Sequence, residues 1–192
     1  MTDKIKVGLI FGGNSSEYEV SIMSAHNIYE EIDTNKFDVY PMWITNDGYL
    51  ADDADSRKVL DNPQMEVANP HKVANISNII ELKDRPEIDV FFPIVHGNLG
   101  EDGCLQGLFR VLDKPFVGDD VLAAAVTMDK EMTKILAQRA GVPVAKWIAV
   151  KRFEYNDPDN EKLDYEYVAS QLGSDLFVKP SNQGSSVGVS HV

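Results

Sequence analysis

The sequence contains a single cysteine, Cys104, so no disulfide can form within the chain. Its four histidines, at positions 26, 71, 96 and 191, lack the spacing of zinc ligands. No apolar run approaches the roughly 18 residues of a membrane span. The apolar stretch from Val7 to Phe11 is also too short for the core of a signal peptide. These absences exclude a disulfide scaffold and predict a protein of the reducing cytoplasm.

Positive charge is also scarce, because 18 Lys and Arg stand against 31 Asp and Glu, a net charge of −13. Such a surface repels phosphate backbones and anionic lipid, so we expect no binding to nucleic acid or membranes. An anionic ligand must be held locally, by a few lysines, backbone N–H groups or helix N-termini. The 192 residues are 43% hydrophobic and 26% charged, as in an ordinary globular protein of one domain or two small ones.

The first 118 residues alternate between strand and helix patterns, which predicts a doubly wound, parallel-sheet α/β domain over residues 1–118. Two mostly apolar runs, at 5–11 and 89–96, predict strands, and the second predicts a strand buried on both faces. Each run ends at a glycine-rich turn that leads into a helix pattern. Between them, residues 37–45 predict a strand whose following Asn-Asp-Gly turn sends a short arm back.

The pattern changes after Gly118, and residues 119–192 predict the beginning of a second domain. Residues 51–87, before that point, are polar, contain three prolines and predict little regular structure. The second domain is predicted to contain one long helix over 121–140, strands at 146–150 and 176–179, a helix at 165–172, and a glycine-rich turn followed by a return arm over 187–192.

Two familiar phosphate motifs are missing, because no G-x-G-x-x-G follows a strand and no G-x-x-x-x-G-K-[ST] occurs. Ordinary Rossmann and P-loop enzymes are therefore disfavoured. The turns after Phe11 and Val95 nevertheless follow parallel strands, at the sheet edge where α/β proteins bind ligands. We expect the polar residues of these turns to converge there; they are Glu17, Ser21, His96, Glu101 and Asp102.

Each candidate residue also has a simpler interpretation. Glu17 could complement the dipole of the following helix, an effect worth about 0.3 to 1 kcal/mol. His96 could be a structural histidine, and the two turn acids could be solvated. Lysines are most often surface residues, but Lys179 closes an apolar strand directly before the glycine-rich turn. That turn suits a polyphosphate cover, although a plain hairpin would look similar.

Four separated motifs resemble those of the D-alanine–D-alanine ligase family of the ATP-grasp superfamily. They are FGG-x-S-x-E-x-EVS at residues 11–21, HG-x-x-GEDG-x-LQG at 96–107, MDK at 128–130 and VKPS-x-x-GSSVG at 178–188. The motifs stand in the family's order and extend over nearly the whole chain. The resemblance implies a Rossmann-like first domain followed by the first part of an ATP-grasp domain.

The resemblance also implies roles for individual residues. Glu17 binds the ammonium of the first D-alanine, Val20 contacts this substrate through its backbone, and His96 lies beside its carboxylate. Ser185 orients Glu17 in a hydrogen-bonded set, so these two residues are the expected catalytic pair. The residues expected to hold the ATP phosphates are Lys130, Lys179, Gly184, Ser185 and Ser186. A carboxylate suits an ammonium, and compact lysine charges suit phosphate oxygens.

The implied reaction is ATP-dependent formation of D-alanyl-D-alanine, a precursor of peptidoglycan and hence of the cell wall and cell shape. The first carboxylate attacks the γ-phosphate to give an acyl phosphate and ADP, and the second amine then displaces phosphate. Mg²⁺, with Mn²⁺ as an alternative, offsets charge during phosphoryl transfer. No covalent enzyme intermediate is needed, so Cys104 is assigned a structural role.

The resemblance covers only about the first half of such a ligase. The family's metal ligands, oxyanion-stabilising arginine, adenine-binding strand and lid have no counterpart in this chain. We therefore expect no metal site in it and no turnover from this piece alone. D-alanine–D-lactate ligase is the nearest alternative, and a non-catalytic ligand-binding fragment is an alternative of another class. A cytoplasmic homodimer is the expected state of the parent enzyme.

Overall fold

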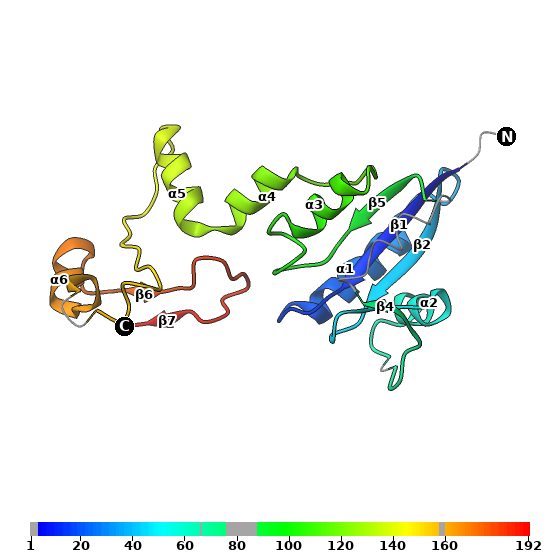
Figure 1. Ribbon diagram of the computed structural model, residues 1–192, viewed down its shortest axis with the longest axis horizontal. Helices are drawn as coiled ribbons and strands as arrows, with labels where there is room; N and C mark the ends of the chain where they lie inside the picture. Colours follow the sequence, from blue (N-terminus) through cyan, green and yellow to red (C-terminus); the bar gives the residue numbers. More distant parts are fainter. Residues whose placement is uncertain (1–3, 66, 76–87, 158–159) are drawn as a thin grey trace. The chain divides into compact units, whose positions relative to one another are not determined.

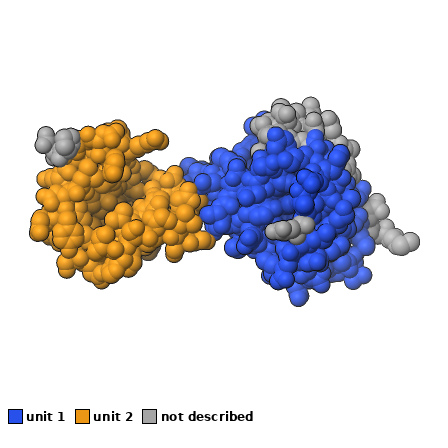
Figure 2. Space-filling view, turned by 90° about the horizontal axis from the view of Figure 1, so that it is seen from below, with its two compact units in different colours: residues 1–125 blue, residues 126–192 orange. Residues whose placement is uncertain are grey.

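The computed structural model describes residues 4–65, 67–75, 88–157 and 160–192. The chain divides into two compact units, Met1–Ala125 and Val126–Val192, which are coloured separately in Figure 2. We describe each unit by itself. The first unit extends past Gly118, where the sequence pattern changes, and a domain boundary at that residue stays a prediction.

A five-stranded sheet forms the centre of the first unit, in the order β4-β3-β2-β1-β5. Strand β1 (Ile5–Gly12) lies between β2 (Phe37–Ile44) and β5 (Val90–Pro93) and pairs with both in parallel. Strands β3 (Tyr49–Ala51) and β4 (Lys72–Asn75) add an antiparallel edge. The predicted parallel centre is therefore correct, and the chain reversal after β2 makes the whole sheet mixed.

Helices cover both faces of this sheet (Figure 1). Helices α1 (Tyr18–Glu31) and α2 (Asp53–Asp61) pack on one face, where Leu9 and Phe11 of β1 are buried. Helix α3 (Cys104–Val111) packs on the other face, where the alternate residue Ile10 is buried. The nearly continuous apolar pattern of β1 thus follows from burial on both sides. The unit is a three-layer α/β/α sandwich.

Residues 51–75 contain more regular structure than the sequence predicts. Helix α2 begins after Asp52, whose side chain accepts a 2.7 Å hydrogen bond from the N–H of Asp55. Val59 and Leu60 of the same helix are buried against the sheet. The prediction of little structure was wrong because a capping aspartate and a two-residue apolar contact suffice to stabilise a short helix on an existing core. Residues 76–87 lie outside the described ranges.

The predicted long helix over 121–140 is two helices, α4 (Val121–Met128) and α5 (Lys130–Arg139). The chain is extended at Asp129, with φ −90° and ψ 111°. The Asp129 side chain accepts hydrogen bonds from the N–H groups of Glu131 and Met132, at 2.9 and 3.0 Å. Apolar periodicity passes through this position without a break, so only the capping ability of the aspartate signals the new helix start.

The rest of the second unit holds one more α-helix and a two-stranded hairpin within the described residues. Helix α6 (Tyr165–Leu172) is preceded by a single 3₁₀ turn, Glu161–Leu163. Strands β6 (Phe177–Val178) and β7 (Ser190–His191) pair antiparallel, which confirms the predicted return arm. The predicted strand over 146–150 was wrong, because that segment forms no ladder with any described residue. An alternating pattern makes a strand only where a neighbouring strand pairs with it.

Candidate functional site

Hydrogen bonds of Ser15 join the turns that follow β1 and β5. The Ser15 hydroxyl donates to the carbonyl of His96 at 2.8 Å and accepts from the N–H of Glu17 at 3.1 Å. Ser16 and Glu19 have the spacing of a capping box, but the N-cap of α1 is Glu17. The two motifs, 81 residues apart along the chain at this contact, therefore meet at the carboxyl edge of the parallel strands.

Glu17 is half-buried, and its side chain makes no capping hydrogen bond to α1. A Cβ atom placed on Gly97 would lie 2.8 Å from Oε2 of Glu17, and Gly97 has a φ of +73°. Glycine is thus required there for both backbone conformation and space. The carboxylate lies against the backbone of the second turn. Interaction with the helix dipole alone would not require this contact.

The imidazole of His96 is held at both ring nitrogens. Its Nε2 lies 3.0 Å from Oγ of Ser24, and its Nδ1 lies 3.4 Å from Oε1 of Glu101. The other oxygen of Glu101 accepts a 2.9 Å hydrogen bond from the N–H of Gly97. The side chain of His96 is 25% exposed. Ser24 was not predicted, although its spacing from Glu17 places both residues on one face of a helix.

Asp102 closes the turn before α3 rather than joining this group. Its carboxylate accepts hydrogen bonds from the N–H groups of Leu99 and Cys104, at 2.9 and 3.0 Å. Burial raises the pKa of Asp102, but these hydrogen bonds outweigh it and hold the pKa below its usual value. The hydrogen bond to Asp102, together with burial, raises the pKa of the Cys104 thiol. A raised thiol pKa opposes nucleophilic reactivity and supports the structural role assigned to Cys104.

Val20 lies in the first turn of α1, three residues after Glu17, and its side chain is 54% exposed. Exposure of so large an aliphatic side chain shows that this position does not serve the core. The resemblance assigns a substrate contact to the backbone of Val20 and not to its side chain. The first turn of a helix suits such a contact, because its backbone N–H groups lack intrahelical partners.

In the second unit, Lys130 brings the MDK motif to the glycine-rich turn. Its N–H donates to the carbonyl of Ser181 at 2.9 Å. Its ammonium donates to the carbonyls of Ser181, at 3.4 Å, and Gln183. The hydroxyl of Ser181 in turn donates to Asp129 at 2.8 Å. Lys130 is therefore half-buried against the turn, unlike an ordinary surface lysine.

The glycine-rich turn is closed by a 3.0 Å hydrogen bond from the N–H of Val187 to the carbonyl of Gly184. The two central residues, Ser185 and Ser186, have φ values of 47° and 61°. Positive φ at both centres is the geometry of a type I′ hairpin turn, and it is strained for serine. Local strain of this kind occurs preferentially at functional sites.

Lys179 is exposed, and its ammonium lies 5.5 Å from the ring centroid of Phe177. Ser185 and Glu17 belong to different units, so the proposed hydrogen-bonded set joining them stays a prediction. The structure thus brings Glu17 and His96, the residues expected to bind the first substrate, together within one unit. It assembles Lys130 with the glycine-rich turn in the other.

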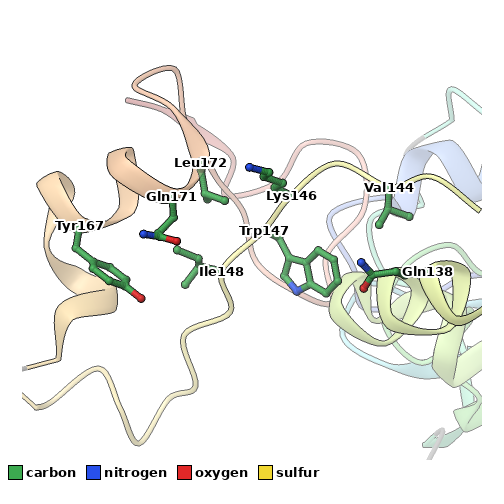
Figure 3. A pocket seen from close by; sticks show the side chains of 8 residues that line it. All are labelled: Gln138, Val144, Lys146, Trp147, Ile148, Tyr167, Gln171 and Leu172. Atoms are coloured by element: carbon green, nitrogen blue, oxygen red, sulfur yellow. The ribbon is translucent and has the colours of Figure 1, made fainter.

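A cavity of about 350 Å³ lies within the second unit, beside α5 and α6. Trp147 and Ile148 line it, together with Tyr167 of α6 (Figure 3). None of its lining residues belongs to the four sequence motifs. The cavity borders the extended segment 146–150, which pairs with no described strand. We therefore do not assign it to the candidate site.

Among the residues that the structure describes, no group of three or more His, Cys, Asp or Glu side chains is arranged to hold a metal ion. Within the same ranges, every helix is too short or too polar to cross a bilayer.

Comparison with known proteins assigns both parts of the chain. Residues 6–119 match the model of the D-ala D-ala ligase N-terminus, and residues 136–192 match that of the D-ala D-ala ligase C-terminus. A D-alanine–D-alanine ligase of Lactobacillus gasseri is 98% identical over 192 residues, which are 100% of this chain and 53% of that protein. The chain thus spans about half the length of the curated relatives that it matches.

Solved structures give the same result. The D-alanine-D-alanine ligase from Coxiella burnetii is 30% identical with a TM-score of 0.76, over 98% of this chain and 56% of that one. The VanG D-Ala:D-Ser ligase from Enterococcus faecalis is 33% identical with a TM-score of 0.73, over 98% of this chain and 55% of that one. The predicted family and α/β fold are confirmed. On its matching models, its motifs and its fold, the chain belongs to the D-alanine–D-alanine ligase family.

Proposed function

We propose that this chain supplies the first-substrate pocket and part of the ATP site of an enzyme that joins two D-alanines for peptidoglycan synthesis. The observation that carries the proposal is the position of Glu17. Its half-buried carboxylate lies against the turn that follows β5, where Gly97 leaves room for it. A partly desolvated carboxylate is suited to an ammonium group, which pairs with it by a charge-assisted hydrogen bond.

In this proposal the first D-alanine lies at the carboxyl edge of β1 and β5. Glu17 binds its ammonium, the backbone at Val20 contacts it, and His96 lies beside its carboxylate. The hydrogen bonds of Ser15 support the arrangement, since they fix the backbones of Glu17 and His96 relative to each other. Fixed geometry of this kind positions a substrate for reaction.

The glycine-rich turn fits a polyphosphate. The ammonium of Lys130 lies beneath the turn, and Lys179 is exposed at its beginning. In the proposal these two lysines and the backbone of Gly184, Ser185 and Ser186 hold ATP, which supplies the phosphoryl group. The described residues form no cluster suited to Mg²⁺ or Mn²⁺. We therefore assign no metal ligand among them and derive no step through a metal.

The reaction has two steps. A carboxylate oxygen of the first D-alanine attacks the γ-phosphorus, the bond to the β-phosphate oxygen breaks, and ADP leaves. The amine of the second D-alanine then attacks the acyl carbon, inorganic phosphate leaves, and the amine loses a proton. This chain contributes orientation and charge to the first step. Ser185 is proposed to orient Glu17 during it.

The second substrate is the open part of the proposal. One solved relative is named a D-Ala:D-Ser ligase, so acceptor choice differs among similar proteins. D-lactate is the alternative acceptor that we consider for this protein. The alternative of another class, a non-catalytic binding module, keeps the first-substrate pocket without turnover.

The test compares this chain with a protein extended to the full length of its relatives. With ATP and D-alanine, the extended protein should release one ADP for each D-alanyl-D-alanine formed. The 192-residue chain should bind D-alanine by calorimetry and form no dipeptide. Release of ADP only when D-lactate is added would favour the alternative acceptor. Absence of both ADP and dipeptide in the extended protein would contradict the ligase proposal.

We further propose that the parent enzyme is a cytoplasmic homodimer. The net charge of −13 on this chain disfavours binding to anionic membranes and nucleic acid, which supports action on small molecules. Light scattering of the extended protein should give twice the mass of one chain, and the mass of one chain would contradict the dimer.

A further inference from the structure

We propose that Ser24 is a positioning residue that keeps the proton of His96 on Nδ1, the ring nitrogen that donates to the carboxylate of the first D-alanine. The hydrogen bonds within the protein carry the first half of this inference. The second half, the role of the substrate carboxylate, rests on the proposed function.

The first observation is a polar stripe on helix α1. Glu17, Ser21 and Ser24 follow one another at intervals of four and three residues, which places them on one face of a helix. This face packs towards the sheet, where an unpaired hydroxyl is costly. Ser21 is buried and bonds to the carbonyl of Ile94 at 2.6 Å. Ser24 is half-buried and meets Nε2 of His96 at 3.0 Å.

The second observation fixes the direction of the hydrogen bonds. One oxygen of the Glu101 carboxylate accepts from the N–H of Gly97 at 2.9 Å, which orients its other oxygen towards Nδ1 of His96 at 3.4 Å. An ionised carboxylate only accepts hydrogen bonds, so Nδ1 carries the proton. In the neutral ring Nε2 then has a lone pair, and the hydroxyl of Ser24 donates to it.

The two contacts differ in length, and this difference assigns their roles. The contact between Nδ1 and Glu101, at 3.4 Å, is long for a hydrogen bond, whereas the contact with Ser24, at 3.0 Å, is of ordinary length. A substrate carboxylate can replace Glu101 as the acceptor of the Nδ1 proton. Ser24 stays in place and prevents the proton from moving to Nε2. Glu101 thus places the proton on Nδ1, and the hydroxyl of Ser24, as donor to Nε2, helps to keep it there when the substrate carboxylate takes the place of Glu101.

The first test reads the tautomer of His96 by long-range ¹H–¹⁵N NMR of the histidine-labelled 192-residue chain, with its signals assigned from a His96→Gln spectrum. The wild-type chain should show the Nδ1–H form. Ser24→Ala should shift the pattern towards the Nε2–H form, and Ser24→Thr, which keeps a hydroxyl, should restore it. An Nε2–H wild type, or a Ser24→Ala pattern identical to wild type, would overturn the inference.

The amide spectrum of each variant shows whether its fold is intact. A change of the His96 tautomer in an intact fold therefore reports positioning of the ring rather than a loss of structure. In the extended protein, Ser24→Ala should raise the KM for the first D-alanine roughly two- to tenfold, the loss of one net hydrogen bond, with kcat nearly unchanged. Ser24→Thr should return the KM to near the wild-type value. Loss of kcat alone would overturn the positioning role.

The two parts of the inference fail separately. If the tautomer responds to Ser24 but D-alanine neither binds to nor shifts the His96 signals of the wild-type chain, the proposed function fails. If D-alanine binds but Ser24→Ala leaves the His96 tautomer unchanged, the proposed function stands and this inference fails.

Discussion

The hydroxyl of Ser21 donates a 2.6 Å hydrogen bond to the carbonyl oxygen of Ile94 and accepts one of 2.8 Å from the N–H of Gly12. Ser21 is fully buried, and through it α1 joins the ends of β1 and β5. These are the strand ends that carry the turns of Glu17 and His96. The positions of these two turns therefore depend in part on a hydroxyl buried in the core.

Ser21→Ala removes this link and leaves the buried N–H of Gly12 without its partner. An unsatisfied buried group costs about 1 to 3 kcal/mol, and we expect a loss of that size in the free energy of unfolding. Trp43 lies in the first unit, so its fluorescence in a Trp147→Phe background reports denaturant unfolding of this unit. The exposed neighbour Ser16 provides the control, since Ser16→Ala should stay within about 0.5 kcal/mol. Equal unfolding midpoints for the two variants would contradict the role of Ser21.

Gly97→Ala should displace the carboxylate of Glu17, because the new Cβ atom would lie 2.8 Å from Oε2. D-alanine binding by the variant should weaken at least tenfold in calorimetry. Gly141→Ala is the matched control, since Gly141 has a similar φ of +80° but no heavy atom within 4 Å of the added Cβ. That variant should show only the cost of backbone strain, about 1 kcal/mol of stability. Unchanged D-alanine affinity in Gly97→Ala would separate Glu17 from the pocket.

The second unit should lose stability in acid through Asp129. The N–H of Met132 lowers the pKa of Asp129; burial opposes this, and the Ser181 hydroxyl adds to the lowering. With a folded pKa below the unfolded value of 3.8, the stabilisation is fully present above that value. It is lost as the pH falls through the folded pKa.

Asp129→Asn should flatten this acid dependence and keep a helix cap, because asparagine also accepts hydrogen bonds at an N-cap. Unfolding midpoints between about pH 2.5 and 6, followed by Trp147 fluorescence in a Trp43→Phe background, measure the effect. An unchanged slope with pH in Asp129→Asn would show that other carboxylates cause the acid sensitivity.

Lys179→Ala should weaken ATP binding by the extended protein. A charge-assisted hydrogen bond is worth about 1.5 to 3 kcal/mol, or roughly 10- to 150-fold in the dissociation constant measured by calorimetry. Lys36→Ala provides a control, since Lys36 is an exposed lysine of the first unit whose ammonium pairs with the surface carboxylate of Asp33. If the two variants bind ATP equally well, Lys179 is an ordinary surface lysine.

Much of the fold was predictable because strong local patterns coincide with the final packing. The apolar run at 89–96 and the glycine turn after Phe11 predicted β5 and the end of β1 correctly. The wrong predictions concern segments whose structure depends on contacts that the local pattern does not show. The segment 146–150 has a strand pattern but no neighbouring strand among the described residues. Asp129 interrupts a helix without interrupting its apolar period.

The candidate site was predictable in its residue types and only partly in its contacts. The motifs placed Glu17 and His96 at one sheet edge, where the structure has them. Ser24 was missed because a serine within an amphipathic helix has no local signature of its role. Its polar spacing from Glu17 was visible, but the imidazole that it meets comes from a residue 72 positions away.

The account depends most on Glu17, and Glu17→Gln tests it most directly. Gln keeps the shape of the side chain and removes its charge, so the substrate ammonium loses its counter-charge. Truncating one partner of such a desolvated pair costs about 2 to 5 kcal/mol. Glu19→Gln is the matched control, because Glu19 is an exposed acid in the first turn of the same helix. A partner of the helix dipole alone contributes at most about 1 kcal/mol of stability.

The deciding measurement is the KM for the first D-alanine in the extended protein, taken together with the melting temperature of each variant. We predict that Glu17→Gln raises this KM at least 30-fold, as about 2 kcal/mol requires, without lowering the melting temperature. Glu19→Gln should leave the KM within twofold of wild type. A lowered melting temperature with an unchanged KM in Glu17→Gln would contradict the account, since it would make Glu17 a partner of the helix dipole only.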